Sequence, residues 1–429
     1  MTDKNKVALT PPMGWNSWDC FGAGVNEEQL MANAEYMCDN LKEYGWEYVV
    51  CDIQWSEPTA HSCNYHNFAE LYMDEYSRLI PAPERFPSSA DGKGFSVIAE
   101  KIHAMGLKFG IHIMRGIPRQ AVHRNTAIKC DGVTARDIAQ QFSVCSWNTD
   151  MYGIKAGVKG AQEYYDSIFE LYASWGVDFI KVDDICITEG HPNNLYSGKA
   201  EIEMIRKAMD KCGRDMVLSL SPGPAQIEHA HHLSVNANMW RLTGDFWDQR
   251  EKVHEMFRKC EMWYKFTSEG CWPDCDMLPF GHLRVGDVRE DSYTRFTKED
   301  QYTVMNLWSI FRSPLIFGGH MPDNDEFTLS LLTNQDIIDI NQHSSGNRPV
   351  VSEKDKAVWT CFDKDGNRVV AFFNLTDDDM TFTMPAEIAE TENITLTNLW
   401  TKEKITASAE DFSLKLAAND SAIFRIEKI

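Results

Sequence analysis

Aspartates that directly follow apolar runs are the residues of this sequence best placed to do chemistry. The run 179–182 ends in Asp183, and the run 48–51 ends in Asp52. Asp245 closes a third such segment. A short apolar run is typical of a parallel strand covered by helices on both faces, and α/β folds place their active sites at the carboxyl ends of such strands. The three carboxylates are therefore predicted to share one mouth of an α/β fold.

Two carboxylates that face each other suit glycoside hydrolysis, where one acts as acid and the other as base or nucleophile. Lys181 and Arg241 lie in the same segments as Asp183 and Asp245. A cation beside each acid can keep a nucleophile ionised or orient a sugar hydroxyl. A metal-dependent barrel hydrolase with aspartate ligands fits the same pattern. The pattern alone leaves both kinds of enzyme open.

Two other groups have spacings seen in metal sites. Cys271 and Cys275 are within the range for zinc, but no second pair lies nearby in sequence. The histidines of the segment 229–232 are interpreted as a solvated helix end. Neither of these two groups is therefore predicted to bind a metal or a cofactor.

The elements that must position the aspartates alternate between strand and helix. Asn26 and Gln29 have the pattern of a capping box at a helix start, and Gly45 follows the end of that helix. Eight such alternations are predicted before about residue 342, and eight strand–helix units close into a barrel. The predicted strands are 13–18, 48–52, 107–113, 179–185, 216–221, 239–242, 272–277 and 314–318.

The chain changes character near Asn347, where short strands replace the strand–helix pattern. Asp365-Gly366 is a hairpin signal between two of them. We predict a (β/α)8 barrel over 1–345 and an antiparallel β-sandwich domain over 346–429. Within the barrel, residues 115–152 show little periodicity and are predicted to be a functional, lid-like loop.

Composition excludes several classes of partner. The chain has 429 residues and a net charge of −22, which argues against nucleic acid and anionic membranes, since both need positive patches. No stretch is long and apolar enough for a membrane span or a signal peptide. The 12 cysteines are scattered rather than arranged as a disulfide framework. A cytoplasmic protein with reduced thiols is predicted.

Five motifs occur in order along the chain: Pro12–Trp18, Tyr48–Trp55, Lys181–Asp183, Arg241–Asp245 and Trp272–Leu278. In register, they resemble the barrel strands of glycoside hydrolase family 27, the α-galactosidase and α-N-acetylgalactosaminidase family. The resemblance covers most of the chain. It implies a (β/α)8 barrel followed by an antiparallel β domain, in agreement with the pattern of elements.

The resemblance also implies the roles of the charged residues in a retaining double displacement. It makes Asp183 the nucleophile and Asp245 the general acid/base. Lys181 and Arg241 would bind ring hydroxyls and keep Asp183 charged.

The same resemblance implies the residues that hold the sugar. Asp52 would accept hydrogen bonds from hydroxyls far from the anomeric carbon, and Trp15 and Trp55 would form walls of the pocket. Asp184 stands where the family has a small or amide residue, and is interpreted as an acid behind the pocket or at its rim rather than the nucleophile.

Three departures from the family pattern bear on the sugar. Ile53 replaces the second acid of an Asp-Asp pair, so one contact to the distal hydroxyls of galactose is missing. His112 replaces a tyrosine and is interpreted as a hydrogen-bonding group of the pocket. Ser221 replaces a glutamate that grips the 2-hydroxyl, which resembles the N-acetylgalactosaminidase pattern unless the loop 115–152 fills that space.

We therefore predict a metal-independent exo-glycosidase acting on a terminal α-linked galactose or N-acetylgalactosamine. The alternatives are the same mechanism on an α-glucoside such as isomaltose or on a β-L-arabinopyranoside, and a non-catalytic sugar-binding relative. Retention of both Asp183 and Asp245 argues against the last, because a binding module needs neither an acid nor a nucleophile. The predicted partner is a carbohydrate, and self-association stays open.

Overall fold

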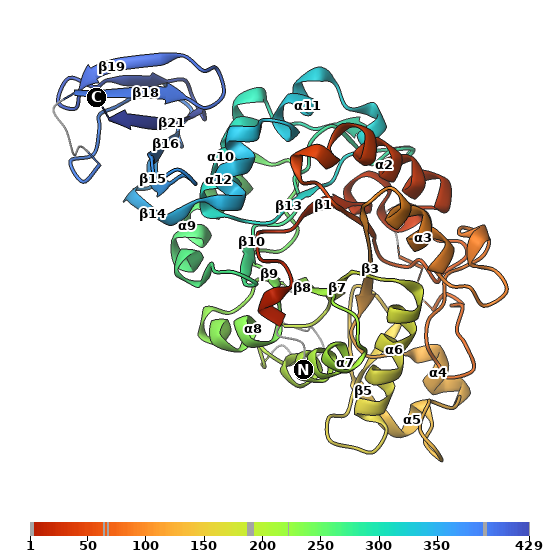
Figure 1. The fold of residues 1–429 in the computed structure, drawn as a ribbon. Coiled ribbons are helices and arrows are strands. Elements are labelled where there is room, and N and C mark those ends of the chain that lie inside the picture. Colours follow the sequence, from red (N-terminus) through yellow and green to blue (C-terminus); the bar gives the residue numbers. More distant parts are fainter. Residues whose placement is uncertain are drawn as a thin grey trace.

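Eight parallel strands surround the centre of the larger domain (Figure 1). The computed structural model describes residues 4–62, 65–66, 68–186, 193–221, 223–388 and 393–428. The strands neighbour one another in the order β10-β9-β8-β7-β3-β2-β1-β13, and a bridge from Leu278, just after β10, to Phe317 of β13 closes the ring. They are β1 Met13–Asn16, β2 Tyr48–Cys51, β3 Lys108–Met114, β7 Phe179–Asp183, β8 Val217–Ser221, β9 Met239–Arg241, β10 Trp272–Asp274 and β13 Leu315–Phe317. The predicted barrel is confirmed.

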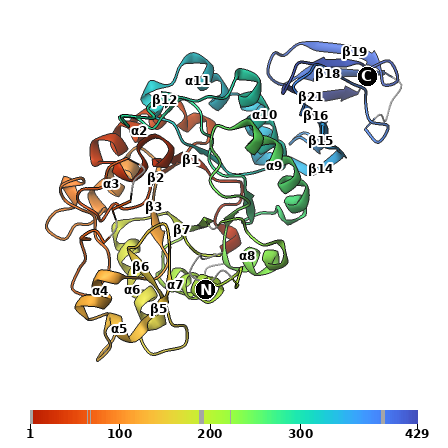
Figure 2. The same ribbon diagram turned by 180° about the vertical axis from the view of Figure 1, so that it is seen from behind.

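Helices form a layer around this ring of strands (Figure 2). The capping box predicted at Asn26 is present: its side chain accepts from the backbone N–H of Gln29, and the Gln29 side chain accepts from the backbone of Asn26. The helices are α1 Trp18–Phe21, α2 Glu27–Asn40, α3 Ser96–Ala104, α6 Ala161–Trp175, α7 Lys199–Lys211, α8 Ala230–Asn236, α9 Arg250–Trp263, α10 Lys298–Phe311, α11 Glu326–Leu332 and α12 Gln335–His343. Among the described residues, no helix combines the length and apolarity needed to cross a bilayer.

Side chains alternate between the barrel interior and the helix layer along each strand. In β2, Tyr48 and Val50 belong to the interior cluster, whereas Val49 packs with the helices. The same alternation makes Phe179 of β7 and Met239 of β9 interior residues. Residues an even number of positions after these interior residues face the inside of the barrel as well, and those at the strand ends reach its mouth. This alternation brings together Asp52, Lys181, Asp183 and Arg241.

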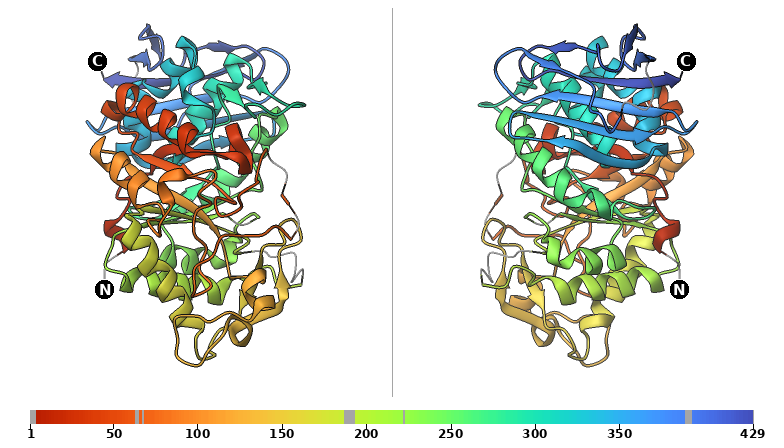
Figure 3. Two further views of the ribbon diagram at one scale, coloured as in Figure 1. Left: turned by 90° about the vertical axis from the view of Figure 1, so that its right-hand side faces the viewer. Right: turned by 90° about the vertical axis from the view of Figure 1, so that its left-hand side faces the viewer.

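The segment 115–152 is folded, which corrects the prediction of a long loop. It contains β4 Ile117–Pro118, α4 Arg119–Arg124, α5 Ala135–Ile138 and β5 Ala139–Val144, and β6 Met151–Ile154 follows it. The three strands pair in the order β4-β6-β5, with a register shift between β5 and β6. Elements this short show no hydrophobic periodicity in the sequence. This subdomain lies at the end of the molecule opposite the C-terminal domain (Figure 3).

The C-terminal domain is an antiparallel β-sandwich, as predicted. Trp359 and Phe373 lie on the face of its large sheet that packs on the barrel, and Val358 and Phe372 lie on the other face, in a second core. The large sheet contains β14 Ser345–Ser352, β15 Lys356–Phe362, β16 Arg368–Asn374, β21 Ser421–Lys428, β18 Asn393–Asn398 and β19 Lys404–Ser408, and the small one β17 Met380–Phe382 and β20 Leu414–Leu416.

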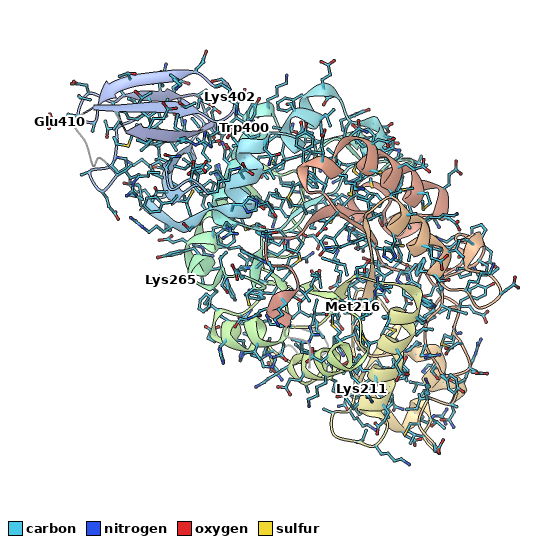
Figure 4. The ribbon with its side chains drawn as sticks, in the orientation of Figure 1. Lys211, Met216, Lys265, Trp400, Lys402 and Glu410 are labelled. Carbon is cyan, nitrogen blue, oxygen red and sulfur yellow. The ribbon has the colours of Figure 1, made fainter. Side chains whose placement is uncertain are left out.

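The two domains are in direct contact. The indole Nε1 of Trp400, labelled in Figure 4, donates to Oδ1 of Asn306 on α10 over 2.9 Å. α12 ends at His343 and β14 begins at Ser345. We retain the division into 1–345 and 346–429 as a proposal.

A small hairpin of β11 (His282–Leu283) and β12 (Ser292–Tyr293) follows β10 in the barrel.

Candidate active site

A cavity of about 360 Å³ opens at the carboxyl ends of the barrel strands, where barrel enzymes carry their active sites. Asp183 and Asp245 both line it, so the two predicted catalytic acids lie in one hollow. Four of the predicted sugar-binding residues line it as well: Asp52, His112, Lys181 and Arg241. The remaining lining residues are Trp18, Asp19, Ile53, Tyr65, Trp147, Gly223, Gly244, Phe246, Trp247, Asp276 and Met277.

Asp183 is the last residue of β7 and is held from two sides. Its Oδ1 accepts from the backbone N–H of Asp184 over 2.8 Å, and its Oδ2 lies 3.3 Å from Nε2 of His112. Burial raises the pKa of Asp183, but the contact with His112 and the positive charges nearby outweigh burial and hold the pKa below its usual range. The group is thus an oriented, ionised carboxylate, as a nucleophile requires.

Asp245 is more open to solvent, with 55% of its side chain exposed. Its Oδ1 pairs with Nη2 of Arg241 over 2.9 Å, and Nη1 of Arg241 lies 3.5 Å from Oδ2 of Asp276. Burial lowers the pKa of Arg241, but the charges of Asp276 and Asp245 outweigh it and raise the pKa. Asp276 itself accepts from the backbone N–H of Phe246 over 2.8 Å. Asp245 therefore combines access to water with a fixed positive neighbour.

Asp52 is buried at the base of the cavity and fully engaged. Its Oδ2 accepts from Nζ of Lys181 over 2.9 Å and from Nδ2 of Asn16 over 2.8 Å, and its Oδ1 accepts from the backbone N–H of Ile53 over 2.9 Å. Burial raises the pKa of Asp52, but the charges of Lys181 and His112 outweigh it and hold the pKa well below its usual range. The pair of Asp52 and Lys181 presents an acceptor and a donor side by side, which suits vicinal hydroxyls.

A buried ionic network lies directly behind the nucleophile position. Arg115 pairs with Oδ2 of Asp184 over 2.8 Å and with Oε1 of Glu201 over 3.1 Å. The hydroxyl of Tyr165 donates to Oε2 of Glu201. Asp184 faces this network rather than the cavity, which agrees with its interpretation as an acid other than the nucleophile.

Trp15 and Trp55 do not line this cavity, which corrects the expectation that they form its walls. Trp15 lies between Gly14 and Asn16, whose side of the strand faces the barrel interior, so the Trp15 side chain points to the helix layer. There its Nε1 donates to the carbonyl of Gly319 over 2.8 Å. Trp55 donates from Nε1 to the carbonyl of His112 over 2.7 Å. Both are core residues.

Other aromatic side chains line the cavity instead, and sequence reasoning missed them. Trp18 stacks on Tyr65 with ring centroids 5.9 Å apart, and Tyr65 lies 5.4 Å from Trp147. Trp247 also lines the cavity and lies under the guanidinium of Arg284. Trp18 follows the end of β1, where loops build barrel sites. Its place past the strand end is the signal that could have found it.

Ser221 lies below the cavity rather than on its wall. It lines a small interior space of about 20 Å³ together with Lys181 and Arg241, and its buried Oγ has no hydrogen-bond partner among the residues that the structure describes. Gly223, two residues further on, does line the cavity. The side chain at 221 therefore reaches the sugar site only from beneath.

The structure forms no group of three or more His, Cys, Asp or Glu side chains suited to a metal ion among the residues it describes. Cys275 contacts Cys260, with the sulfur atoms 3.5 Å apart, whereas Cys271 contacts the carbonyl of Ser234. His232 bonds to the hydroxyl of Tyr196.

Comparisons with known proteins agree with this architecture. The family model for "Alpha galactosidase A" matches residues 148–343, and that for "Alpha galactosidase C-terminal beta sandwich domain" matches residues 353–426. The chain is 26% identical to "Alpha-galactosidase 2" of Arabidopsis thaliana over 84% of this chain and 74% of that protein.

Two crystal structures are more similar. The chain is 52% identical to a GH27 β-L-arabinopyranosidase from Geobacillus stearothermophilus, with 99% of this chain and 98% of that chain covered and a TM-score of 0.95. It is 49% identical to a candidate α-N-acetylgalactosaminidase from Bacillus halodurans C-125, with 98% of each chain covered and a TM-score of 0.88.

Proposed function

Because the chain belongs to glycoside hydrolase family 27, we propose that it is a retaining exo-glycosidase that releases a terminal β-L-arabinopyranosyl unit. The observation that carries the reaction is the pair of acids in one cavity, Asp183 ionised and oriented and Asp245 open to solvent. The observation that carries the choice of sugar is the apolar side chain of Ile53 on the cavity wall.

The reaction proceeds in two displacements. Asp183 attacks the anomeric carbon while Asp245, protonated, gives its proton to the leaving oxygen. A glycosyl ester on Asp183 results. Asp245, now a carboxylate, takes a proton from water, which attacks the anomeric carbon, breaks its bond to the Asp183 carboxylate and frees the sugar with its original anomeric configuration. Arg241 holds the Asp245 carboxylate in place in this second step, since the two groups pair over 2.9 Å.

Asp52, Lys181 and His112 bind the ring of the sugar. Asp52 and Lys181 are 2.9 Å apart, so neighbouring hydroxyls can donate to the first and accept from the second. His112 lines the same cavity and lies 3.3 Å from the Asp183 carboxylate. Buried, mutually bonded groups of this kind hold their geometry before substrate arrives, which favours the transition state.

The apolar wall at Ile53 favours a pentose. β-L-Arabinopyranose has the ring of α-D-galactopyranose without the hydroxymethyl group on carbon 5. A site with an acid in place of Ile53 can pair the hydroxyl of that group, whereas Ile53, buried beside Asp52, leaves it without a partner. An unpaired buried hydroxyl costs affinity, so the sugar lacking it is preferred.

α-Galactosidase activity is the second candidate, and the family model that matches residues 148–343 supports it. Either sugar can use the same five polar residues, because these residues bind the part of the ring that the two sugars share. They are Asp52, Lys181, Asp183, Arg241 and Asp245. The prediction of N-acetylgalactosamine rested on Ser221, whose position under the cavity weakens it. A reducing, cytoplasmic location is proposed with this function, supported by the free thiols of the described cysteines.

Steady-state hydrolysis of three nitrophenyl glycosides tests the proposal: the β-L-arabinopyranoside, the α-D-galactopyranoside and the α-N-acetylgalactosaminide. We expect the highest kcat/KM on the first, measurable activity on the second, and none with Asp183→Ala. The configuration of the first product, followed by NMR, should match that of the substrate. Release of none of the three sugars would favour the non-catalytic relative, and loss of activity on chelation would favour a metal-dependent hydrolase.

A further inference from the structure

A second cavity, of about 320 Å³, lies beside the active site and shares none of its lining residues. It lies between the segment 68–71, helix α4 and residues 149–150. The segments that carry Tyr65 and Trp147 to the active-site cavity continue into the walls of this second cavity. We propose that this cavity binds the carboxylate-bearing sugar ring of a uronic acid, through the guanidinium of Arg119.

Hydrogen bonds hold the three walls of the cavity together. The side chain of Gln120 accepts from the backbone N–H of Leu71 over 2.8 Å and donates to the carbonyl of Leu71 over 2.9 Å. Thr149 accepts from the backbone N–H of Phe68 over 3.0 Å. The backbone N–H of Arg119 donates to the carbonyl of Asp150 over 2.8 Å. The cavity is therefore a built feature of the fold.

Arg119 is the unsatisfied group of this cavity. Its side chain makes no hydrogen bond and no ion pair with any residue in the described part of the chain, and its buried Nε has no partner. The guanidinium carbon lies 5.0 Å from the ring centroid of Phe68 and 4.9 Å from that of Tyr152. The two rings hold the guanidinium by cation–π contacts and leave its N–H groups for a ligand.

The charges around Arg119 favour an anion. Arg124 and His123 also line the cavity. Glu70 forms an ion pair with Arg124 over 2.9 Å, and the Asp150 carboxyl accepts a hydrogen bond from the side chain of Gln54 over 2.9 Å. Burial raises the pKa of Asp150, whereas the hydrogen bond from Gln54 and the charge of Arg119 act in the opposite direction. Two carboxyls, Glu70 and Asp150, thus line the cavity beside the two arginines, but each already has a partner other than Arg119.

The shape of the cavity favours a sugar acid among anions. A planar guanidinium fork pairs two N–H groups with the two oxygens of a carboxylate. The ring of Phe68 is 72% exposed and offers an apolar surface to the face of a sugar ring. Thr149 and Gln120 add polar groups for hydroxyls. The choice of a sugar rests on the proposed function, because a glycosidase meets carbohydrate chains that extend beyond the unit it removes.

Isothermal titration calorimetry on the full-length protein tests the proposal with sodium D-glucuronate, D-glucose and sodium phosphate. We expect saturable binding of glucuronate, binding of glucose at least about tenfold weaker, and no displacement of glucuronate by equimolar phosphate. Arg119→Gln should weaken glucuronate binding at least about tenfold, and Arg119→Lys should weaken it less, since it keeps the charge but loses the fork. Arg258→Gln, on the exposed side of α9, is the matched control and should bind as wild type does.

Lys181→Ala separates the two cavities. Glucuronate binding that persists in this variant and is lost in Arg119→Gln supports the second site. Equal binding by Arg119→Gln and wild type, loss of binding in Lys181→Ala, or binding of phosphate without glucuronate would each overturn the proposal. Arg119→Gln should keep the wild-type melting temperature and hydrolyse nitrophenyl β-L-arabinopyranoside within about twofold of the wild-type rate, since Arg119 does not line the catalytic cavity. If wild type hydrolyses none of the three glycosides, the proposed function fails, but the calorimetric result stands.

Discussion

The backbone N–H of Asp184 donates to Oδ1 of Asp183, with 2.8 Å between the nitrogen and the oxygen. Asp184 makes this bond from a left-handed backbone conformation, with φ at 52°, which is uncommon for a residue with a side chain. Arg115 holds Asp184 in that conformation, because it pairs with the Asp184 carboxylate and donates from Nε to the Asp184 carbonyl. The orientation of the proposed nucleophile therefore depends on a cation that does not line the cavity.

Replacement of that cation should impair both stability and catalysis. Arg115→Met leaves the buried carboxyls of Asp184 and Glu201 without their partner, which should lower the free energy of unfolding by about 3–5 kcal/mol. Lys129→Met breaks a solvent-exposed pair with Glu170 and should cost less than about 1 kcal/mol. Urea unfolding of both variants measures the difference, and equal losses would contradict the role assigned to Arg115. Glu201→Gln, which keeps the shape of the network, should retain more activity than Arg115→Met.

The two proposed catalytic acids should respond differently to the leaving group. Asp183→Ala should lose activity on every glycoside, because no covalent intermediate forms. Asp245→Ala should lose about 10²–10⁴-fold in kcat on a glycoside with a poor leaving group, but less on a nitrophenyl glycoside, which needs little protonation. Steady-state kinetics on a nitrophenyl and an alkyl glycoside measure this. The same loss on both substrates for Asp245→Ala would exclude it as the general acid.

Ile53 should control the choice between pentose and hexose. Ile53→Asp places a hydrogen-bond acceptor beside Asp52 and should shift the ratio of kcat/KM values toward the α-galactoside by about 10–200-fold, the range for a change in one pocket contact. Ile53→Val keeps an apolar wall and should leave the ratio within about threefold. The nitrophenyl β-L-arabinopyranoside and α-D-galactopyranoside serve as the substrate pair. A constant ratio in Ile53→Asp would show that another residue sets the specificity.

His112 should set the acid limb of the pH profile. Burial raises the pKa of Asp183, and the hydrogen bond and charge of His112 are the largest effects that lower it. His112→Leu removes both, so the pKa of Asp183 should rise and the acid limb of kcat/KM should move up by about one pH unit or more. His231→Gln, exposed on α8, is the control. An unmoved acid limb in His112→Leu would mean that another group limits activity at low pH.

Asp274 should make the protein less stable as the pH rises. Burial, and then the charge of Asp276, raises the pKa of Asp274 to about 7, whereas an unfolded aspartate titrates near about 3.9. The folded state binds this proton more tightly, so stability falls between about pH 4 and pH 7 and is level above that range. Asp274→Asn removes this loss of stability with rising pH. The melting temperature of the variant minus that of wild type should therefore rise from pH 5 to pH 8. Asp215→Asn, on the surface, controls for the loss of one charge. A difference in melting temperature between Asp274→Asn and wild type that stays constant from pH 5 to pH 8 would contradict the prediction.

Strands with continuous apolar runs were predicted well, and short elements were not. A parallel strand buried on both faces needs an apolar side chain at nearly every position, so runs such as 48–51 and 179–182 are visible in the sequence. Strands β4 to β6 depend on partners that are distant in sequence, and β14, β19 and β20 expose polar residues or are brief. Their sequences carry no comparable pattern, so they were missed.

Six of the residues predicted for the site line the cavity (Asp52, His112, Lys181, Asp183, Arg241 and Asp245), whereas the aromatic residues that line it from loops were not predicted. Asp52, Lys181, Asp183 and Arg241 follow from the two-residue alternation along a strand, because each is an even number of positions from an interior residue. The same alternation directs Trp15 to the helix layer, which was overlooked when Trp15 was predicted to line the pocket.

By itself the sequence determined the barrel, the β-sandwich and the acids at the strand ends, because burial of parallel strands imposes a local pattern on side chains. Only the tertiary structure decided which aromatic rings border the cavity, that Ser221 lies beneath it, and that no acid among the described residues forms an ion pair with Arg119. These depend on how loops distant in sequence fold onto one another, and contacts of that kind leave no periodic trace in the chain.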